Sequence, residues 1–367
     1  MSIERVIVSG GGTGGHIFPA LAIANEIKKR YPKAAILFVG ALGRMEMEKV
    51  PAAGYEIVGL PVMGFPRKPG LKMVTFIIRL LKSALLARKI VNNFQPQLAI
   101  GVGGYASGPL LRAAAAKNIP TLIQEQNSYA GITNKMLGKK VKTICVAYEN
   151  MERFFPASKI VLTGNPVREN LILELPERGD ALEFFGLKQG RRVVLIVGGS
   201  LGARSINNAV LKNLEFIRQS DVEFIWQTGA IYFDRICSEL EGNQPANLHI
   251  HQFISRMDLA YSTAGVVISR AGAGTISELC LVGKPSVLVP SPNVAEDHQT
   301  KNALALVEKG AAVLIRDSEI DENLFPAVLQ LMNDDEKCKT LSEKIKSLAK
   351  PDATQKIVDE AEKMIRK

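Results

Sequence analysis

Aspartate is absent from the first 179 residues, although the 367-residue chain contains 36 acidic residues in all. Residues 1–165 hold 22 Lys and Arg against 8 Glu, a balance of +14, whereas the remaining residues hold 24 against 28, a balance of −4. A surplus of cations attracts anions, so we expect the first half to bind an anionic partner. A phosphorylated substrate, a membrane surface and a nucleic acid are the three classes to consider.

Cysteine is scarce as well. Cys145, Cys237, Cys280 and Cys338 lie far apart and form no C-x-x-C pair, which argues against a zinc site and suits a reducing compartment. The N-terminus lacks the basic start and long apolar core of a signal peptide. We therefore expect a protein of the cytoplasm or of the cytoplasmic face of a membrane. Its length and its 47% hydrophobic content predict two folded domains.

What the chain does contain is a run of glycine turns that follow short apolar strands. The clearest unit spans residues 266–289, with a strand over 266–268, a turn at residues 270–275, a helix over 276–282 and a strand over 287–289. The N–H groups at the start of such a helix can receive an anion, and Glu278 lies one turn further on, where it could accept hydrogen bonds from sugar hydroxyls. Glycines that only permit close packing are the alternative.

The N-terminal end of the chain repeats this arrangement. A strand over residues 5–9 precedes GGGTGGH, and a helix over residues 17–30 follows. Gly10, Gly12 and Gly15 satisfy G-x-G-x-x-G, but the second strand, over 35–39, ends without the Asp or Glu that would hold an adenosine ribose. The glycines can still form a backbone cradle for phosphate. His16, at the edge of that cradle, could take a proton from a hydroxyl. The alternative is a purely structural role for a histidine at the start of a helix.

Further strands continue the pattern in both halves. Those over residues 98–102 and 121–123 end in GGYASGP and QEQN, and a second series begins with a strand over 193–197 followed by GGSLGAR. Asn165-Pro166 blocks a helix. We predict an α/β fold of two Rossmann-like domains facing each other across a cleft: residues 1–164, joined by a C-terminal helix at about 350–367, and residues 165–349.

Residues 59–94 differ from the rest because they combine an apolar loop with a basic, apolar helix over 71–93. Between residues 65 and 89 there are seven cations and no acidic residue. The apolar run is too short to span a bilayer, which takes about 20 apolar residues. Apolar and basic residues together favour a surface that rests on anionic lipid. We expect this surface to include Phe65, Arg67, Lys68, Lys72, Arg79 and Lys82, with an ordinary solvated helix face as the alternative.

Seven motifs together resemble one family. GGGTGGHIFPALA, GGYASGP, EQNSYAGITNK, GNPVR, VGGSLGAR, SRAGAGTISEL and EDHQTKNA occur in the order found in the bacterial undecaprenyldiphospho-muramoylpentapeptide β-N-acetylglucosaminyltransferases. The likeness spans roughly residues 5–310. It implies a glycosyltransferase-B fold and inverting transfer of GlcNAc from UDP-GlcNAc to the 4-hydroxyl of MurNAc in lipid I, which gives lipid II for the cell wall.

The resemblance also implies where the substrates bind. The UDP-GlcNAc contacts would be Thr13, Gly14, Gly15, Asn127, Arg168, Ser200, Ile254, Ala273, Gly274, Thr275, Ile276, Ser277, Glu278 and Gln299. Gly103, Gly104 and Tyr105 would receive the acceptor's pyrophosphate. For the general base we choose His16 first and Glu125 second. The expected partners are UDP-GlcNAc, lipid I, an anionic membrane surface and other proteins of cell-wall synthesis and division.

We expect neither a cofactor nor a metal, because no D-x-D pair suited to Mg²⁺ lies near a glycine loop and helix N-termini can absorb the charge of departing UDP. Two alternatives stay open. A UDP-GlcNAc 2-epimerase would share the architecture but would not need the basic, apolar surface. A non-enzymatic nucleotide-sugar or RNA-binding protein is the other, but the first half has neither an RNP-like strand nor a basic stripe interleaved with aromatics, so we expect no nucleic acid.

Overall fold

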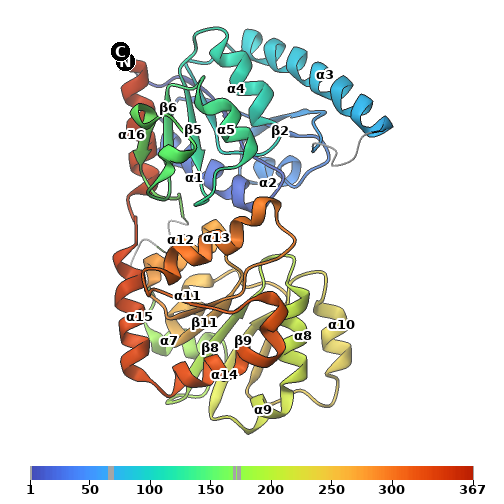
Figure 1. Ribbon diagram of the computed structural model, residues 1–367, viewed down its shortest axis with the longest axis vertical. Helices are drawn as coiled ribbons and strands as arrows, with labels where there is room; N and C mark the ends of the chain where they lie inside the picture. The colour runs from blue at the N-terminus through green and yellow to red at the C-terminus, as the bar shows by residue number, and fades with distance from the viewer. Residues whose placement is uncertain (1, 65–69, 168–170, 172–174, 367) are drawn as a thin grey trace. The chain divides into compact units, whose positions relative to one another are not determined.

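The chain forms two compact α/β units (Figure 1). The structure, a computed structural model, describes residues 2–64, 70–167, 171 and 175–366. Unit 1 comprises Met1–Val167 together with Lys350–Lys367, and unit 2 comprises Arg168–Ala349. The sequence placed the border after residue 164, whereas the chain passes into unit 2 after Val167 and returns at Lys350.

Unit 1 is built on a seven-stranded parallel sheet with the strand order β3-β2-β1-β4-β5-β6-β7. The strands are β1 (Arg5–Ser9), β2 (Ala35–Ala41), β3 (Glu56–Leu60), β4 (Leu98–Gly101), β5 (Thr121–Glu125), β6 (Thr143–Val146) and β7 (Ile160–Leu162). The order reverses next to β1, so the loops after β1 and β4 lie side by side at the carboxyl edge, where ligands bind in open α/β sheets.

Helices cover both faces of this sheet. They are α1 (Gly14–Arg30), α2 (Glu46–Ala52), α3 (Leu71–Phe94), α4 (Ser107–Ala115), α5 (Ile132–Gly138) and α16 (Ala353–Arg366). One core joins α1 and α16 to the sheet, and the other joins α3, α4 and α5 to the opposite face. Because both faces are buried, the strands are almost continuously apolar, as the sequence suggested.

The C-terminal helix α16 returns from unit 2 and packs beside α1 (Figure 1). Ile357 and Val358 are fully buried in the same core as the β-strands of unit 1. The Arg30 guanidinium donates to Asp359 at 2.6 Å and to Glu362 at 3.0 Å. This pairing raises the pKa of Arg30 further above its ordinary range, although burial opposes the shift. Apolar packing and ion pairs thus join the last helix to unit 1.

Unit 2 repeats the architecture with six parallel strands in the order β10-β9-β8-β11-β12-β13. The strands are β8 (Arg192–Val197), β9 (Val222–Gln227), β10 (Leu248–His251), β11 (Val266–Ser269), β12 (Ser286–Leu288) and β13 (Val313–Leu314). The helices are α7 (Arg178–Phe184), α8 (Arg204–Lys212), α9 (Leu214–Gln219), α10 (Phe233–Glu239), α11 (Met257–Thr263), α12 (Ala273–Val282), α13 (His298–Val307), α14 (Ile320–Met332) and α15 (Asp335–Ser347). The predicted pair of Rossmann-like domains is confirmed.

Two helix starts were predicted wrongly, in the same way. We expected helices to begin at residues 17 and 276, but α1 begins at Gly14 and α12 at Ala273, each three residues earlier. Glycine disfavours a helix interior, yet the first turn makes no N–H bonds within the helix, so glycine costs less there. The glycine loops therefore supply the first turns of α1 and α12, and with them N–H groups that have no acceptor within the helix.

Candidate active site

The first glycine loop connects β1 to α1 and carries His16 in the first turn of the helix. The His16 Nδ1 atom lies 3.1 Å from the carbonyl oxygen of Gly11 and 3.5 Å from the Thr13 hydroxyl. A carbonyl oxygen only accepts hydrogen bonds, so the bond to Gly11 requires the proton on Nδ1. The lone pair of the neutral ring is then on Nε2. Thr13, Gly14 and Gly15 form the start of α1 next to it.

The second glycine loop follows β4 and touches the first. Gly103 and Gly104 have positive φ angles of 101° and 85°, a conformation that favours glycine. A Cβ on Gly104 would lie 2.5 Å from the Gly11 carbonyl oxygen, and a Cβ on Gly103 would lie 2.8 Å from His16 Nε2. Only glycine permits this approach, so the basic nitrogen of His16 faces the loop that precedes Tyr105, a residue that is 51% exposed.

Glu125, at the end of β5, lies in a different setting from His16. Its carboxylate is 1% exposed and accepts hydrogen bonds from the backbone N–H groups of Asn127 and Gly131, both at 3.0 Å. The side-chain amides of Asn127 and Asn134 donate to it at 3.2 and 2.8 Å. Four donors thus engage the two oxygens, so taking a proton from a sugar hydroxyl would disrupt the loop that holds Asn127. The geometry favours His16 over Glu125 as the base.

In unit 2, a buried glutamine joins two of the predicted donor contacts. The Gln227 side chain, 3% exposed at the end of β9, donates to the Gly199 carbonyl oxygen at 3.1 Å and accepts from the Ile254 N–H at 2.8 Å. It therefore links the loop that carries Ser200 to the segment that carries Ile254. The sequence analysis missed Gln227; its position directly after a buried strand was the available signal.

The turn from β11 into α12 brings most of the remaining donor residues together. Ala273, Gly274 and Thr275 form the first turn of α12, whose N–H groups have no acceptor within the helix. The Ile276 side chain is 2% exposed and belongs to the core, so only its backbone is available to a ligand. The Ser277 hydroxyl donates to the Ala273 carbonyl oxygen at 3.0 Å.

Glu278 is oriented by a residue that the sequence analysis also missed. The Tyr261 hydroxyl, on a side chain that is 1% exposed, donates to Glu278 Oε2 at 3.1 Å. Tyr261 comes from α11, and no local pattern links it to α12. The Gln299 side chain, in the first turn of α13, accepts from the Ser291 N–H at 2.8 Å and so holds the loop after β12.

Several predicted residues lie outside the described part of the chain. Arg168 among the donor contacts, and Phe65, Arg67 and Lys68 on the predicted membrane surface, are in this group. Lys72 lies in the first turn of α3, but its side chain is not among those described. Arg79 and Lys82 are described, and both are exposed on α3.

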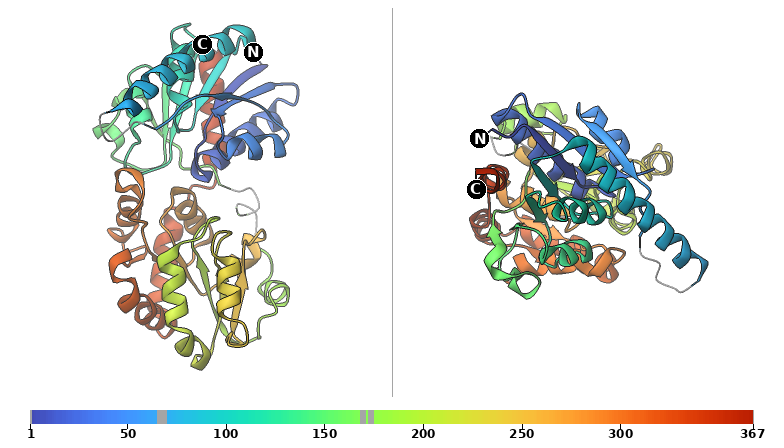
Figure 2. Two further views of the ribbon diagram at one scale, coloured as in Figure 1. Left: turned by 90° about the vertical axis from the view of Figure 1, so that its right-hand side faces the viewer. Right: turned by 90° about the horizontal axis from the view of Figure 1, so that it is seen from above.

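The exposed face of α3 combines apolar residues with these cations. Val74, Ile77, Ile78, Leu81 and Leu85 are between 47% and 66% exposed, values that are high for large apolar side chains. Figure 2 shows the first turns of α3 reaching beyond the rest of unit 1. A groove of about 570 Å³ lies along the helix and is lined by Leu42, Gly43, Pro61, Val62, Thr75, Ile78, Arg79 and Lys82. No described helix is long and apolar enough to cross a bilayer.

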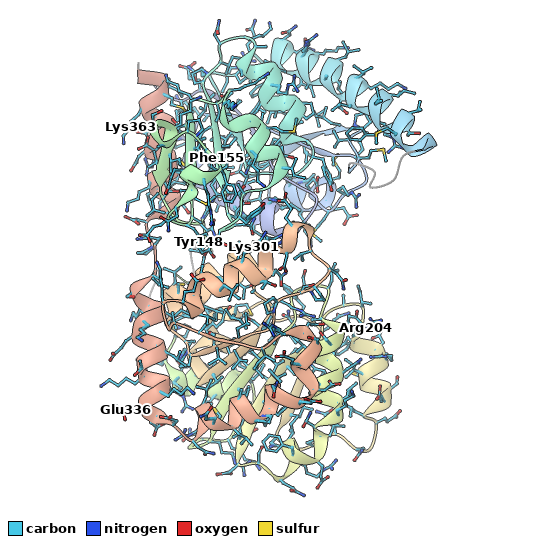
Figure 3. The ribbon with its side chains drawn as sticks, viewed as in Figure 1. Tyr148, Phe155, Arg204, Lys301, Glu336 and Lys363 are labelled. Carbon is cyan, nitrogen blue, oxygen red and sulfur yellow. The ribbon has the colours of Figure 1, made fainter. Side chains whose placement is uncertain are left out.

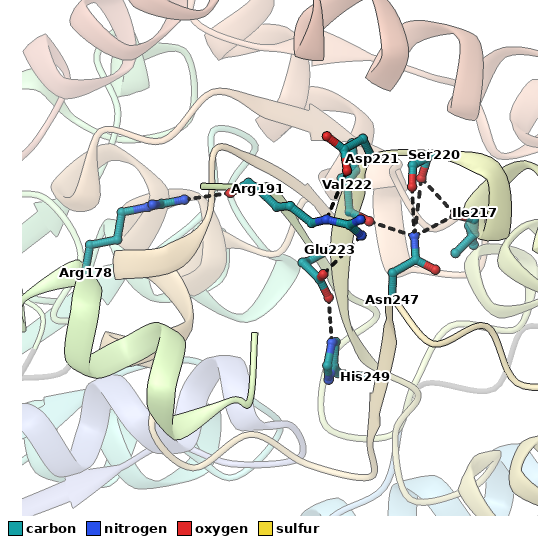
Figure 4. A network of polar contacts seen from close by, with 9 residues as sticks. All are labelled: Arg178, Arg191, Ile217, Ser220, Asp221, Val222, Glu223, Asn247 and His249. Carbon is teal, nitrogen blue, oxygen red and sulfur yellow. Dashed lines mark hydrogen bonds and ion pairs between the residues drawn. The ribbon is translucent and has the colours of Figure 1, made fainter. Parts of the chain in front are cut away.

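His249 and His251, two residues apart on β10, both have partners within unit 2. His249 Nε2 lies 2.8 Å from the buried Glu223 carboxylate, to which Arg191 also donates (Figure 4). His251 packs edge-on against Phe185 with ring centroids 5.5 Å apart. Burial, followed by the charge of His249, lowers the pKa of His251.

Two lysines of unit 2 differ in their surroundings. Lys301 lies on α13 and is labelled in Figure 3, and its ammonium donates to the Glu296 carbonyl oxygen at 2.7 Å. The Lys284 side chain lies largely within unit 2, and burial, with a smaller effect from Arg178, lowers its pKa to about 8. Its ammonium lies 3.5 Å from the Ser262 carbonyl oxygen. At neutral pH the folded protein therefore keeps a protonated Lys284 in a largely buried position, which lowers the free energy of unfolding.

Comparisons of the whole chain with known proteins give consistent results. The N-terminal domain of glycosyltransferase family 28 matches residues 6–146, and the C-terminal domain of that family matches residues 193–357. The UDP-N-acetylglucosamine–N-acetylmuramyl-(pentapeptide) pyrophosphoryl-undecaprenol N-acetylglucosamine transferase of Parabacteroides distasonis is 58% identical over 99% of both chains. The crystal structure of Acinetobacter baumannii MurG superposes with a TM-score of 0.77 at 31% identity, covering 98% of this chain and 99% of that one.

A UDP-N-acetylglucosamine 2-epimerase structure also resembles the chain. It superposes with a TM-score of 0.66 at 14% identity, covering 98% of this chain and 95% of the epimerase. Such a low identity shows a shared fold and no more. The architecture alone is therefore common to transferases and epimerases, and the functional distinction depends on the sequence and on the site.

Proposed function

The chain belongs to glycosyltransferase family 28, and we propose that it transfers GlcNAc from UDP-GlcNAc to the 4-hydroxyl of MurNAc in undecaprenyl-pyrophosphoryl-MurNAc-pentapeptide. The product is lipid II, the precursor of peptidoglycan. The observation that carries the proposal is the 58% identity, along 99% of both chains, with the N-acetylglucosamine transferase of Parabacteroides distasonis. The matched region includes the glycine loops of both units. It therefore covers the proposed donor-binding residues as well as the proposed acceptor-binding residues.

Unit 2 holds the donor in this proposal. UDP carries a diphosphate, and the N-terminus of α12 offers N–H groups and the positive end of a helix dipole to it. Glu278, oriented by Tyr261, accepts hydrogen bonds from the ribose hydroxyls. The Ser200 loop and Ile254, joined by Gln227, complete the donor site. Asn127, Arg168 and Gln299 remain proposed donor contacts on the strength of the family likeness.

Unit 1 binds the acceptor and supplies the base. The MurNAc 4-hydroxyl oxygen attacks C1 of GlcNAc, the bond from C1 to the UDP oxygen breaks, and UDP leaves with the electron pair. The hydroxyl proton passes to His16 Nε2, which carries the lone pair because Nδ1 donates to Gly11. Attack opposite to the leaving group inverts the configuration at C1. Gly104, Tyr105 and Gly103, the last of which lies next to Nε2, would receive the acceptor's pyrophosphate.

The surface formed by α3 is proposed to rest on the anionic cytoplasmic face of the bacterial membrane, where the lipid-linked acceptor is found. Six exposed apolar side chains of α3, the five named above and Leu80, and the described cations Arg79, Lys82, Arg88 and Lys89 support this. The groove of about 570 Å³ beside α3 has an apolar lining with two cations at its edge, which suits an amphiphile with an anionic head. The protein would then be peripheral to the membrane and near other cell-wall enzymes.

The decisive experiment is to incubate the protein with UDP-GlcNAc, with and without a lipid I analogue, and to separate the products. The transferase releases UDP only with the acceptor and forms a β-1,4-linked disaccharide. An epimerase would convert UDP-GlcNAc to UDP-ManNAc without any acceptor, and a binding protein would leave the nucleotide sugar intact. Either of the latter results would refute the proposed function.

A further inference from the structure

A buried carboxylate lies behind the first glycine loop and is not explained by substrate binding. Glu46, the first residue of α2, is 0% exposed. Its Oε2 accepts a hydrogen bond from the Gly12 N–H and its Oε1 accepts one from the Ala41 N–H, both at 2.9 Å. The carboxylate therefore connects the loop after β1 to the end of β2.

The loop leaves space for this carboxylate at two glycines. A Cβ on Gly11 would lie 2.1 Å from Glu46 Oε1, and a Cβ on Gly40 would lie 2.5 Å from Glu46 Cγ. Neither distance is possible in a folded protein, so both positions require glycine as long as Glu46 occupies its site. In a dinucleotide-binding fold, the acidic residue that follows the second strand holds a ribose. Here the acidic residue after β2 is turned inward and holds the loop.

The hydrogen bond from the Gly12 N–H to Glu46 also fixes the direction of the Gly11 carbonyl, which is the hydrogen-bond partner of His16. The Gly12 N–H and the Gly11 carbonyl belong to one peptide unit, which is planar and trans, so they point in opposite directions. The N–H points to Glu46 and the carbonyl oxygen accepts from His16 Nδ1 at 3.1 Å. A peptide between two glycines can rotate as a unit at little steric cost, and Gly12 has a φ of +87°. The carboxylate stabilises one of its orientations.

We propose that Glu46 is a positioning residue that acts on His16 through the Gly11–Gly12 peptide. Its charge fixes the peptide and polarises it, which strengthens the Gly11 carbonyl as an acceptor for the Nδ1 proton. The imidazole is thereby kept in the tautomer with its lone pair on Nε2, which faces the Gly103 loop. The inference rests on the proposed role of His16 as the base, but the tautomer can be measured without turnover.

The first test is the tautomer of His16 in the free wild-type protein. Two-dimensional ¹H–¹⁵N spectra of the imidazole rings at pH 8 distinguish the two neutral forms, and the spectrum of His16→Gln identifies the His16 signals among the four histidines. We expect the Nδ1–H form. A predominant Nε2–H form would overturn the inference, whatever the activity of the enzyme.

The second test removes the charge of Glu46. Glu46→Gln offers one oxygen to two N–H donors, so at least one of the two bonds is lost. We expect the Nε2–H tautomer to become populated and kcat to fall about tenfold to a hundredfold, while the KM for UDP-GlcNAc stays within about twofold. Glu48→Gln is the matched control, because Glu48 is exposed on the same helix two residues further on and should change nothing.

The remaining outcomes are also decisive. A folded Glu46→Gln protein with the wild-type tautomer and kcat would show that the carboxylate serves only the stability of the loop. If Glu46→Gln does not fold, Glu46→Asp keeps the charge but is one methylene too short to reach both N–H groups, and the same two measurements apply. If the wild-type protein has the Nδ1–H form and Glu46→Gln changes it, but the wild-type protein shows no transferase activity, the proposed function is refuted. The positioning of His16 by Glu46 is then still supported.

Discussion

Donor recognition offers a sharp test, because the Tyr261 hydroxyl donates to Glu278, the proposed ligand of the ribose. Glu278 is proposed to bind the ribose hydroxyls, and the Tyr261 hydroxyl donates to it at 3.1 Å from a side chain that is 1% exposed. A hydrogen bond to a charged group contributes about 1.5–3 kcal/mol. Glu278→Ala should therefore raise the KM for UDP-GlcNAc about tenfold to a hundredfold and leave the acceptor KM unchanged.

Tyr261→Phe keeps the packing of the ring and removes only its hydroxyl. The Glu278 carboxylate then loses one donor and is held less firmly, which we expect to cost about 0.5–1.5 kcal/mol of donor binding and to raise the UDP-GlcNAc KM about twofold to tenfold. In the Glu278→Ala background the same change should have an effect below twofold, because the group it orients is absent. The two substitutions form a double-mutant cycle, and we expect its coupling energy to equal nearly the whole loss of donor binding caused by Tyr261→Phe alone.

The assay is initial-rate kinetics of UDP release at saturating acceptor, with thermal unfolding to show that each variant is folded. Multiplicative effects of the two substitutions on KM would refute the coupling, and Tyr261 would then stabilise α11 alone. A normal KM in folded Glu278→Ala would remove Glu278 from the donor site altogether.

Three further predictions follow from other parts of the chain. His16→Ala should lower kcat by about 10²–10⁴ with little change in UDP affinity, and the fall of the wild-type rate on acidification should disappear; retention of that fall would assign the base role elsewhere. The double substitution Arg79→Glu and Lys82→Glu should weaken binding to anionic vesicles in a sedimentation assay, by about 1 kcal/mol per cation removed. Activity on a water-soluble acceptor should persist in this variant. The control Leu81→Ser should leave the salt dependence of vesicle binding unaltered. The pKa of Lys284, lowered to about 8, lies below its unfolded value, so the unfolded chain binds more protons between about pH 8 and 10.5 and stability rises with pH there. Lys284→Met should abolish this part of the slope and stabilise unit 2 at pH 7 in denaturant titrations; a slope equal to wild type would contradict it.

The succession of elements was predictable because it depends on local pattern. The apolar run of residues 193–197 became β8, and the expected strand over 266–268 became β11 with one additional residue. A buried strand needs continuous apolar residues, and a glycine turn must follow where the chain reverses toward a helix. The likeness of seven motifs added the activity and most of the proposed contacts.

Within the glycine loops, only the folded structure showed which groups engage which. The sequence analysis treated the loop of residues 10–15 as a phosphate cradle, but the Gly12 N–H is bonded to Glu46. It ranked Glu125 second as a base, and four N–H donors surround that carboxylate. A hydrogen-bond partner depends on three-dimensional position, which spacing along the chain does not give.

The amino-acid sequence was enough to predict the two α/β domains, the glycine turns at the strand ends and His16 as the candidate base, because these follow from hydrophobic period, from glycine's conformational freedom and from residue chemistry. Only the tertiary structure brought in Glu46, Gln227 and Tyr261, which are 34, 27 and 17 residues from the groups they bind. Each is a buried polar side chain whose hydrogen bonds must be satisfied within the fold, and the parallel sheet brings its partner from a different strand or helix. Local pattern thus decided where the candidate site forms, and long-range packing decided how the side chains of that site are held.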